Sequence, residues 1–253
     1  MTVPLHYTLD GPPGAPVVVL GSSLGTNRGM WQPQMEALTA SLRVLRYDHR
    51  GHGGSPVPPG PYSLAELGGD LLALLDILEL PRVRLGGLSL GGMVAMWVAA
   101  NAPERVESLA LLCTSAQLGP PSMWRDRVSA VRQGGVAAIA DAVLDRWFTP
   151  EFTARHAGVV GWARRMLVTT PDEGYVGCCA AIETMDLVPS LSTISAPALV
   201  IAGERDPATP PPHLEQIAAG IAGSRLEVLP DVAHLANVER PEAVNRLLLE
   251  FWS

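Results

Sequence analysis

The sequence is poor in cysteine and has no long apolar run, no basic start and no excess of basic charge. Its three cysteines are Cys113, Cys178 and Cys179. An odd count, with two of the cysteines adjacent, does not suggest a set of disulfides, and no C-x-x-C spacing typical of a metal site occurs. We therefore expect reduced, buried thiols, no metal site and a cytoplasmic protein.

The other absences exclude two kinds of partner. A formal net charge of −7 disfavours nucleic acid and anionic membrane surfaces. The opening MTVPLHYTLD does not resemble a signal peptide. The most apolar stretch, residues 85–100, is short for a membrane span and is interrupted by glycine and serine. With 47% hydrophobic residues, the chain can instead bury a sizeable core.

Strand and helix patterns alternate along most of the chain. Short β-branched or apolar runs predict strands, and apolar residues at helical spacing predict helices, with Ser63 and Glu66 as a capping box. The strand patterns cover 5–10, 15–23, the start of 43–55, 83–88, 106–115, 195–203 and 224–230; the helix patterns cover 27–42, 63–80, 89–103, 213–223 and 241–252. This alternation predicts an α/β fold, with a mostly parallel sheet covered by helices on both faces.

One segment departs from this alternation. Residues 117–191 show helical periodicity and several aromatics but no convincing strand. The sequence therefore predicts a core formed by residues 1–116 and 192–253, interrupted by a helical cap at 117–191. Inserts of this kind cover the mouth of a site and shape its specificity.

The segment Gly87-Leu88-Ser89-Leu90-Gly91 matches G-x-S-x-G at the junction of a predicted strand and a predicted helix. In that context the motif indicates a nucleophile elbow, with Ser89 as the nucleophile. The two outer glycines leave room for a sharp turn, and the start of the helix favours negative charge. A plain serine cap is the alternative, but it would not explain a glycine on each side.

A serine nucleophile needs a base that an acid orients, and in this architecture the chain order is serine, acid, histidine. His234 lies between the last predicted strand and the last helix, so it can return to the edge where Ser89 emerges. His213 is the alternative base, expected as a solvated surface residue. Asp206, which follows a strand and precedes a proline, is the preferred acid, with Glu204 as its alternative.

The tetrahedral intermediate of acyl transfer needs two backbone N–H donors. One is expected from Leu90, the residue after the nucleophile. The other is expected from the Gly- and Ser-rich loop after the second predicted strand, with Leu24 preferred and Ser23 as the alternative. These two donors would form the oxyanion hole.

Together these residues resemble the α/β-hydrolase family over essentially the whole chain. Residues 48–55 look like the family's D-x-R-G-x-G-x-S loop, in which we interpret Asp48 and Arg50 as structural, ion-paired residues. The short N-terminus suggests that the first of the usual eight strands is missing. The stretch 22–26 with Met30 and Trp31, and the stretch 174–182 with Asp186, resemble the 3-oxoadipate enol-lactonases.

This resemblance implies hydrolysis of 3-oxoadipate enol-lactone to 3-oxoadipate in the β-ketoadipate pathway of aromatic-compound breakdown. Ser89, Asp206 and His234 would be the catalytic triad, and no cofactor would be needed. The implied partner is a small anionic lactone. A carboxylesterase or a carbon–carbon bond hydrolase with the same triad remains an alternative, as does a non-catalytic ligand-binding protein on the same scaffold.

Three further residues are candidates for contact with such a lactone. In the cap, Trp124 offers apolar area and an N–H, and Arg127 offers a partner for a carboxylate. Trp31, outside the cap, could also face the site. Packing of the tryptophans into a core and exposure of the arginine remain the alternative for these residues.

Overall fold

The computed structural model describes all residues, 1–253, and contains one sheet of seven strands in the order β1-β3-β2-β4-β5-β6-β7. Only the β1–β3 pair is antiparallel. The strands are β1 (Tyr7–Asp10), β2 (Val17–Gly21), β3 (Arg43–Tyr47), β4 (Val83–Leu88), β5 (Val106–Leu112), β6 (Ala198–Gly203) and β7 (Arg225–Leu229). The predicted α/β fold with a mostly parallel sheet is confirmed.

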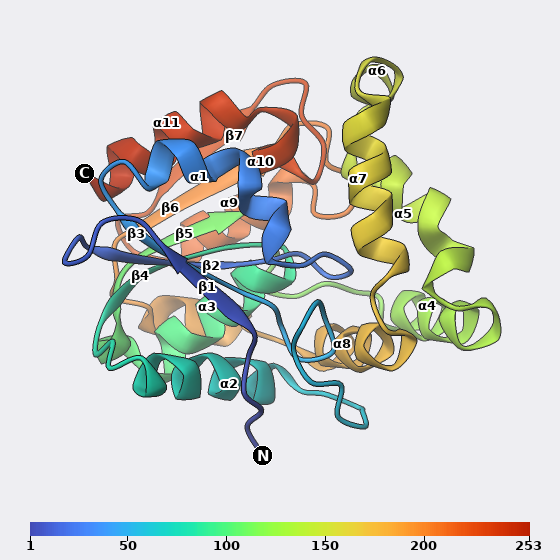
Figure 1. Ribbon diagram of the computed structural model, residues 1–253, viewed down its shortest axis with the longest axis horizontal. Helices are drawn as coiled ribbons and strands as arrows, with labels where there is room; N and C mark the ends of the chain where they lie inside the picture. The colour runs from blue at the N-terminus through green and yellow to red at the C-terminus, as the bar shows by residue number, and fades with distance from the viewer.

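Helices cover both faces of this sheet (Figure 1). The pair α1 (Gln32–Leu38) and α11 (Pro241–Trp252) covers one face, while α2 (Leu64–Ile77) and α3 (Leu90–Asn101) cover the other; α9 (Pro211–Gly220) packs against β6 and β7. The helix α3 is almost wholly buried because it is apolar all round. None of the helices combines the length and apolarity that crossing a bilayer requires.

The helix predicted over 27–42 is shorter and is divided in two. A 3₁₀ turn, η1 (Arg28–Trp31), comes first, and α1 follows it. Asn27 begins the turn by accepting the Gly29 N–H at 2.9 Å. Pro33 has no N–H to donate and therefore fits in the first turn of α1, where no intrahelical acceptor is available.

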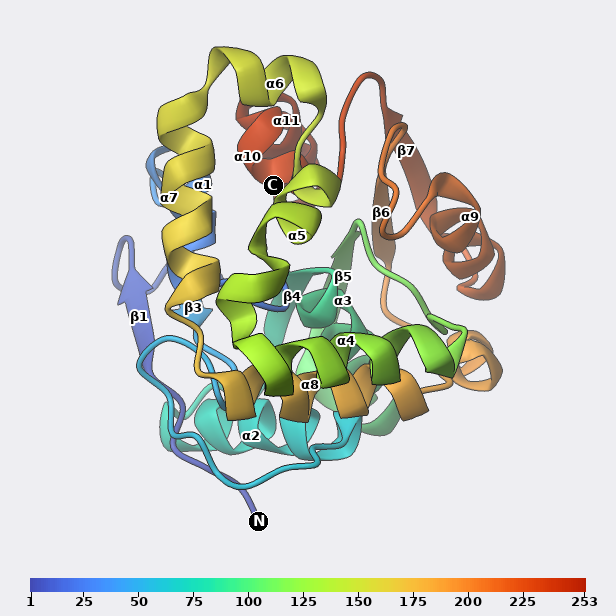
Figure 2. The ribbon, with the colours of Figure 1, turned by 90° about the vertical axis from the view of Figure 1, so that its right-hand side faces the viewer.

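The insert between β5 and β6 contains helices and no strand. Its members are α4 (Pro121–Gly134), η3 (Val136–Ile139), α5 (Ala140–Trp147), α6 (Pro150–Arg155), α7 (Ala157–Val168), α8 (Asp172–Thr184) and η4 (Val188–Thr193). Figure 2 shows α4, α5 and α8 in front of the sheet end where β4 meets α3. The remaining elements are η2 (Pro103–Arg105) and α10 (Ala236–Glu239).

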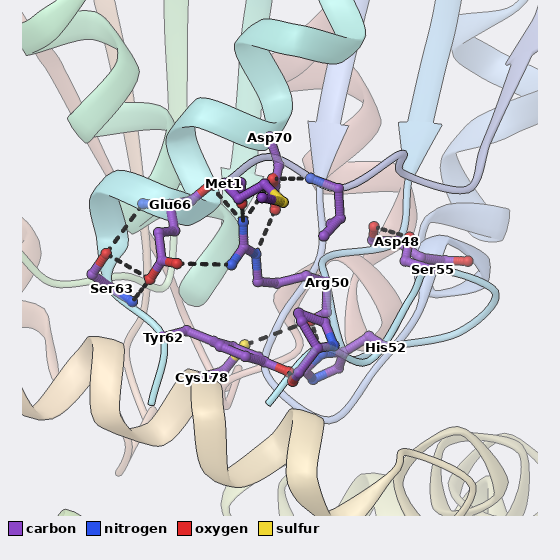
Figure 3. A network of polar contacts seen from close by, with 12 residues as sticks. Met1, Asp48, Arg50, His52, Ser55, Tyr62, Ser63, Glu66, Asp70 and Cys178 are labelled. Atoms are coloured by element: carbon purple, nitrogen blue, oxygen red, sulfur yellow. Dashed lines mark hydrogen bonds and ion pairs between the residues drawn. The ribbon is translucent and has the colours of Figure 1, made fainter. Parts of the chain in front are cut away.

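Arg50 and Asp48 are ion-paired, but with separate partners. The Arg50 guanidinium donates to both oxygens of Asp70, at 2.6 and 2.8 Å, and to Glu66 at 3.1 Å. Figure 3 shows this side chain reaching α2 beside the ring of Tyr62. Asp48 instead pairs with Arg28 at 2.8 Å. Both residues hold the loop after β3 in place, as their structural interpretation predicted.

Arg50→Ala should lower the free energy of unfolding by about 3–5 kcal/mol, because it leaves the Asp70 carboxylate buried without its cation. The Arg50 and Asp70 side chains are only 3% and 1% exposed. Glu66→Gln is the control: the Glu66 side chain is 37% exposed, and glutamine can still complete the capping box, so we expect a loss below about 1 kcal/mol. Urea denaturation measures the free energy of unfolding of the two variants, and equal losses in Arg50→Ala and Glu66→Gln would contradict this account.

Candidate active site

Ser89 lies at a strained turn between β4 and α3. Its backbone angles are φ 56° and ψ −116°, a conformation that side-chain-bearing residues rarely adopt. The Ser89 N–H donates to the carbonyl of Leu112 on β5 at 3.0 Å, and its own carbonyl accepts from the Thr114 hydroxyl at 2.7 Å. Strain of this kind costs about 1–3 kcal/mol and persists only where the surroundings hold it. The predicted strand–turn–helix position of Ser89 is confirmed.

The flanking glycines permit two backbone segments to touch. A Cβ on Gly87 would lie 2.2 Å from the carbonyl carbon of Gly91. A Cβ on Gly91 would lie 2.2 Å from the carbonyl oxygen of Gly21 at the end of β2. Ser89 makes no side-chain capping bond to α3, so the plain-cap alternative is wrong. The glycines therefore allow a tight turn that leaves the serine hydroxyl free.

Asp206 and His234 form a buried pair. Asp206 Oδ2 accepts from His234 Nδ1 at 2.8 Å and from the Thr209 hydroxyl at 2.7 Å, while Oδ1 accepts from two backbone N–H groups. Burial opposes ionisation of Asp206, but the attraction of His234 and the Thr209 hydrogen bonds outweigh it, so the pKa of this carboxyl lies below its usual value. An ionised Asp206 fixes the ring and leaves His234 Nε2 available to accept a proton.

The alternative base and acid lie elsewhere. His213 Nδ1 is 2.8 Å from the Ser115 hydroxyl, so this half-buried residue is not the solvated side chain that was expected. Glu204 is exposed, and its carboxylate accepts the backbone N–H of Asp231 at 3.1 Å. Neither residue lines the cavity that contains Ser89.

Ser89 and His234 line one small cavity, of about 40 Å³, under the cap. No hydrogen bond joins their side chains in the structure; such bonds often tighten only when substrate binds. The other lining residues come from the loop after β2, from the cap and from the loop after β6: Ser23, Leu24, Leu118, Trp124, Arg127, Val143, Arg146, Trp147, Tyr175, Ile182, Ala208 and Thr209. The lining thus combines apolar side chains with several polar and charged ones, as small-molecule sites usually do.

Two backbone N–H groups close to Ser89, those of Leu24 and Leu90, make no hydrogen bond within the protein. Leu24 lines the cavity, and its N–H donates to no protein acceptor. Leu90 is the first residue of α3, where N–H groups have no partner within the helix. The carbonyl of Ser22 accepts the Gly91 N–H at 3.0 Å and so joins the loop after β2 to the start of α3. The arrangement can stabilise an oxyanion between the two donors.

Two neutral histidines support this loop, and the sequence analysis missed both roles. His49 Nε2 donates to the Ser22 carbonyl at 3.0 Å, and His52 Nε2 accepts the Gly25 N–H at 3.0 Å. Burial lowers the pKa of His49 to about 3 and that of His52 to about 4, so both rings are uncharged near neutral pH. Figure 3 shows His52 beside Arg50, whose carbonyl is 3.2 Å from His52 Nδ1. The sequence holds no signal for either contact, because each joins residues 27 positions apart.

Of the three pocket candidates, Trp124 and Arg127 line the cavity and Trp31 does not. Trp31 is fully buried and donates its indole N–H to the Gly21 carbonyl at 3.3 Å, so the expectation that it faces the site is wrong. The Trp124 N–H is also used internally, by the Leu118 carbonyl at 2.8 Å. Trp124 therefore offers its ring rather than its N–H to a ligand.

Arg146, which the sequence analysis did not single out, joins Arg127 at the cavity. The Arg127 guanidinium lies 4.9 Å from the centre of the Trp124 ring. Burial, followed by the nearby charge of Arg127, lowers the pKa of Arg146. No carboxylate pairs with either guanidinium, so two cationic side chains line the cavity without an anionic partner. No group of three or more His, Cys, Asp or Glu side chains is arranged to hold a metal ion.

The fold agrees with comparisons to known proteins. Residues 16–136 match the family model described as the alpha/beta hydrolase fold. Over 96% of its length the chain is 39% identical to 3-oxoadipate enol-lactonase 2 of Acinetobacter baylyi, covering 91% of that protein. The chain belongs to the α/β-hydrolase family. It is a hydrolase of the carboxylic-ester class.

Two further proteins similar to this α/β-hydrolase are described with different activities. The crystal structure of the enol-lactonase from Burkholderia xenovorans LB400 superimposes with a TM-score of 0.96 at 43% identity, covering 98% of this chain and 96% of that one. RutD of Variovorax paradoxus, described as a candidate carbamate hydrolase, is 32% identical over 98% of this chain and 96% of its own.

Proposed function

We propose that this α/β-hydrolase opens 3-oxoadipate enol-lactone to 3-oxoadipate through an acyl-enzyme, in the cytoplasmic β-ketoadipate pathway of aromatic-compound breakdown. The observation that carries the proposal is one cavity shared by Ser89, His234 and the unpaired guanidinium groups of Arg127 and Arg146. The similarity to enol-lactonases supports it, and the three free, buried cysteines fit a reducing compartment.

In this proposal Ser89 Oγ attacks the lactone carbonyl while His234 Nε2 takes the hydroxyl proton. Asp206 stabilises the imidazolium that forms, and the N–H groups of Leu24 and Leu90 stabilise the oxyanion. Collapse of the intermediate breaks the ring C–O bond, and the released enol oxygen takes the proton from His234. The enol tautomerises to the ketone. A water, deprotonated by His234, then cleaves the acyl-enzyme, which releases 3-oxoadipate and restores Ser89.

The two unpaired guanidinium groups that line the cavity favour an anionic substrate. With its own net charge of −7, the protein offers no general attraction for an anion, so the attraction must be local. Arg127 and Arg146 come from different cap helices, α4 and α5, and lie near the buried hydroxyl of Tyr175. A substrate carboxylate here would gain charge-assisted hydrogen bonds and would offset the repulsion between the two cations.

The test compares the enol-lactone with p-nitrophenyl acetate, an uncharged ester, on the wild-type enzyme and on Arg146→Met. We expect the wild-type kcat/KM to be higher for the lactone. The variant keeps most of the side-chain volume but loses the charge, so KM for the lactone should rise about 10–100-fold, the effect of losing a hydrogen bond to a charged group. Turnover of the acetate should change by less than about threefold.

Arg132→Met is the matched control, because Arg132 lies in the same cap but is exposed and does not line the cavity. This variant should leave KM and turnover unchanged for both substrates. Faster wild-type turnover of the acetate would instead favour a carboxylesterase, and preference for a phenyl carbamate would favour the activity described for the RutD relative. Stoichiometric binding of the lactone without turnover would favour a ligand-binding protein.

A further inference from the structure

The loop after β2 contains a buried hydroxyl that no protein group satisfies. Ser23 is 1% exposed, and its Oγ has no hydrogen-bond partner. The neighbouring hydroxyls are partnered: Ser22 Oγ donates to the Asn27 carbonyl at 3.2 Å, and Thr26 Oγ1 donates to the Ser23 carbonyl at 2.7 Å. Buried polar side chains without a partner are uncommon because each forfeits its interaction with water.

This hydroxyl is not needed to hold the loop, because the Ser23 backbone is already fixed. The Ser23 N–H contacts the Met30 sulfur at 3.2 Å, and the Ser23 carbonyl accepts both the N–H of Thr26 at 3.1 Å and its hydroxyl. These bonds set the plane of the Ser23–Leu24 peptide. The carbonyl and the N–H of a trans peptide point in opposite directions, so they also set the direction of the free Leu24 N–H.

The position of Ser23 indicates what its hydroxyl would bind. Ser23 lines the catalytic cavity together with Leu24, Ser89 and His234. A hydroxyl can donate one hydrogen bond, and the next group along the chain, the Leu24 N–H, is a donor too. Adjacent donors without acceptors suit a single negatively charged oxygen, and in this cavity such an oxygen forms when a nucleophile attacks a carbonyl.

We propose that the Ser23 hydroxyl donates a third hydrogen bond to the oxyanion, beside the backbone N–H groups of Leu24 and Leu90. This inference rests on the proposed function, because it assumes that Ser89 attacks an acyl carbon. The contact acts mainly in the transition state, where the oxygen carries its full charge. Loss of the hydroxyl therefore lowers kcat more than it changes KM.

Ser23→Ala tests the inference with steady-state kinetics on the enol-lactone and with thermal unfolding. We expect kcat to fall about 10–100-fold, somewhat less than the loss of a principal oxyanion donor, with KM within about threefold of wild type. The melting temperature should stay the same or rise, because the variant removes an unsatisfied buried hydroxyl. A boronic acid that forms a tetrahedral adduct with the nucleophile should lose affinity in parallel with kcat/KM.

Ser108→Ala is the matched control. Ser108 Oγ on β5 is likewise buried without a partner but does not line the cavity, so kcat should not change. An unchanged kcat in Ser23→Ala would overturn the inference, and so would a loss of activity that follows a lower melting temperature. If Ser89→Ala abolishes turnover while Ser23→Ala does not reduce it, only this inference fails; if Ser89→Ala stays active, the proposed function fails as well.

Discussion

Replacing Ser89 by alanine should lower kcat for the enol-lactone by about 10⁶-fold, the loss found when the nucleophile of another serine hydrolase is removed. The hydroxyl is the only part of the side chain lost, and no protein group bonds to it. The strained backbone is retained, because alanine has the same Cβ as serine. Steady-state kinetics on the purified variant give the fold-change directly.

The fold of Ser89→Ala should be unchanged. The turn is held through the Ser89 backbone, whose N–H donates to the Leu112 carbonyl and whose carbonyl accepts from the Thr114 hydroxyl, and the substitution changes neither group. Thermal unfolding within a few degrees of wild type would show that lost activity reflects chemistry. A folded variant that keeps more than about 1% of wild-type kcat would refute the assignment of the nucleophile.

His234→Ala should cause a loss of similar size, because members of a triad act as a unit. Without the imidazole, no group takes the Ser89 proton, and Asp206 cannot act in its place because its carboxylate is bound by Thr209 and by backbone N–H groups. These same bonds keep Asp206 satisfied in the variant, so we expect it to fold. The measurement is kcat/KM on the enol-lactone.

His213→Ala provides the control for the base. His213 bonds to Ser115 and does not line the cavity, so its loss should change kcat/KM by less than about threefold. If His213→Ala were the damaging substitution and His234→Ala remained active, the base would have been misassigned. Comparable damage from both would indicate a structural effect instead.

The elbow could be predicted because its cause is local. A turn this tight needs glycine at 87 and at 91, where a Cβ would collide with backbone, and those glycines are visible in the sequence around Ser89. Asp206 and His234 were found by their order along the chain, because the carboxyl ends of parallel strands meet at one edge of the sheet. Chain order does not give the distance between them, which required the structure.

The pocket residues were predicted less well because tertiary packing decides them. Nothing in the sequence separates Arg146 from the exposed arginines of the cap, since only the placement of α5 brings it to the cavity. Trp31 was a further candidate for the site, but its indole N–H donates to the Gly21 carbonyl at the end of β2. For Trp124, the sequence could not show that its N–H is taken by a carbonyl six residues earlier.

The roles of His52 and Ser23 were also out of reach of the sequence. His52 is far from the loop after β2 along the chain, and only its contact with the Gly25 N–H shows that it supports that loop. Ser23 was weighed for its backbone N–H, whereas the structure draws attention to its hydroxyl. In both cases the informative fact is which hydrogen bonds are made and which are left unmade, and folding alone determines that.

The most direct test of the central claim is covalent labelling with a fluorophosphonate, followed by peptide mass spectrometry. The account predicts one adduct per chain, on Ser89, formed in proportion to the loss of enol-lactone hydrolysis and absent from Ser89→Ala. An adduct on a different residue with the same loss of turnover, or full hydrolysis by the labelled protein, would contradict it.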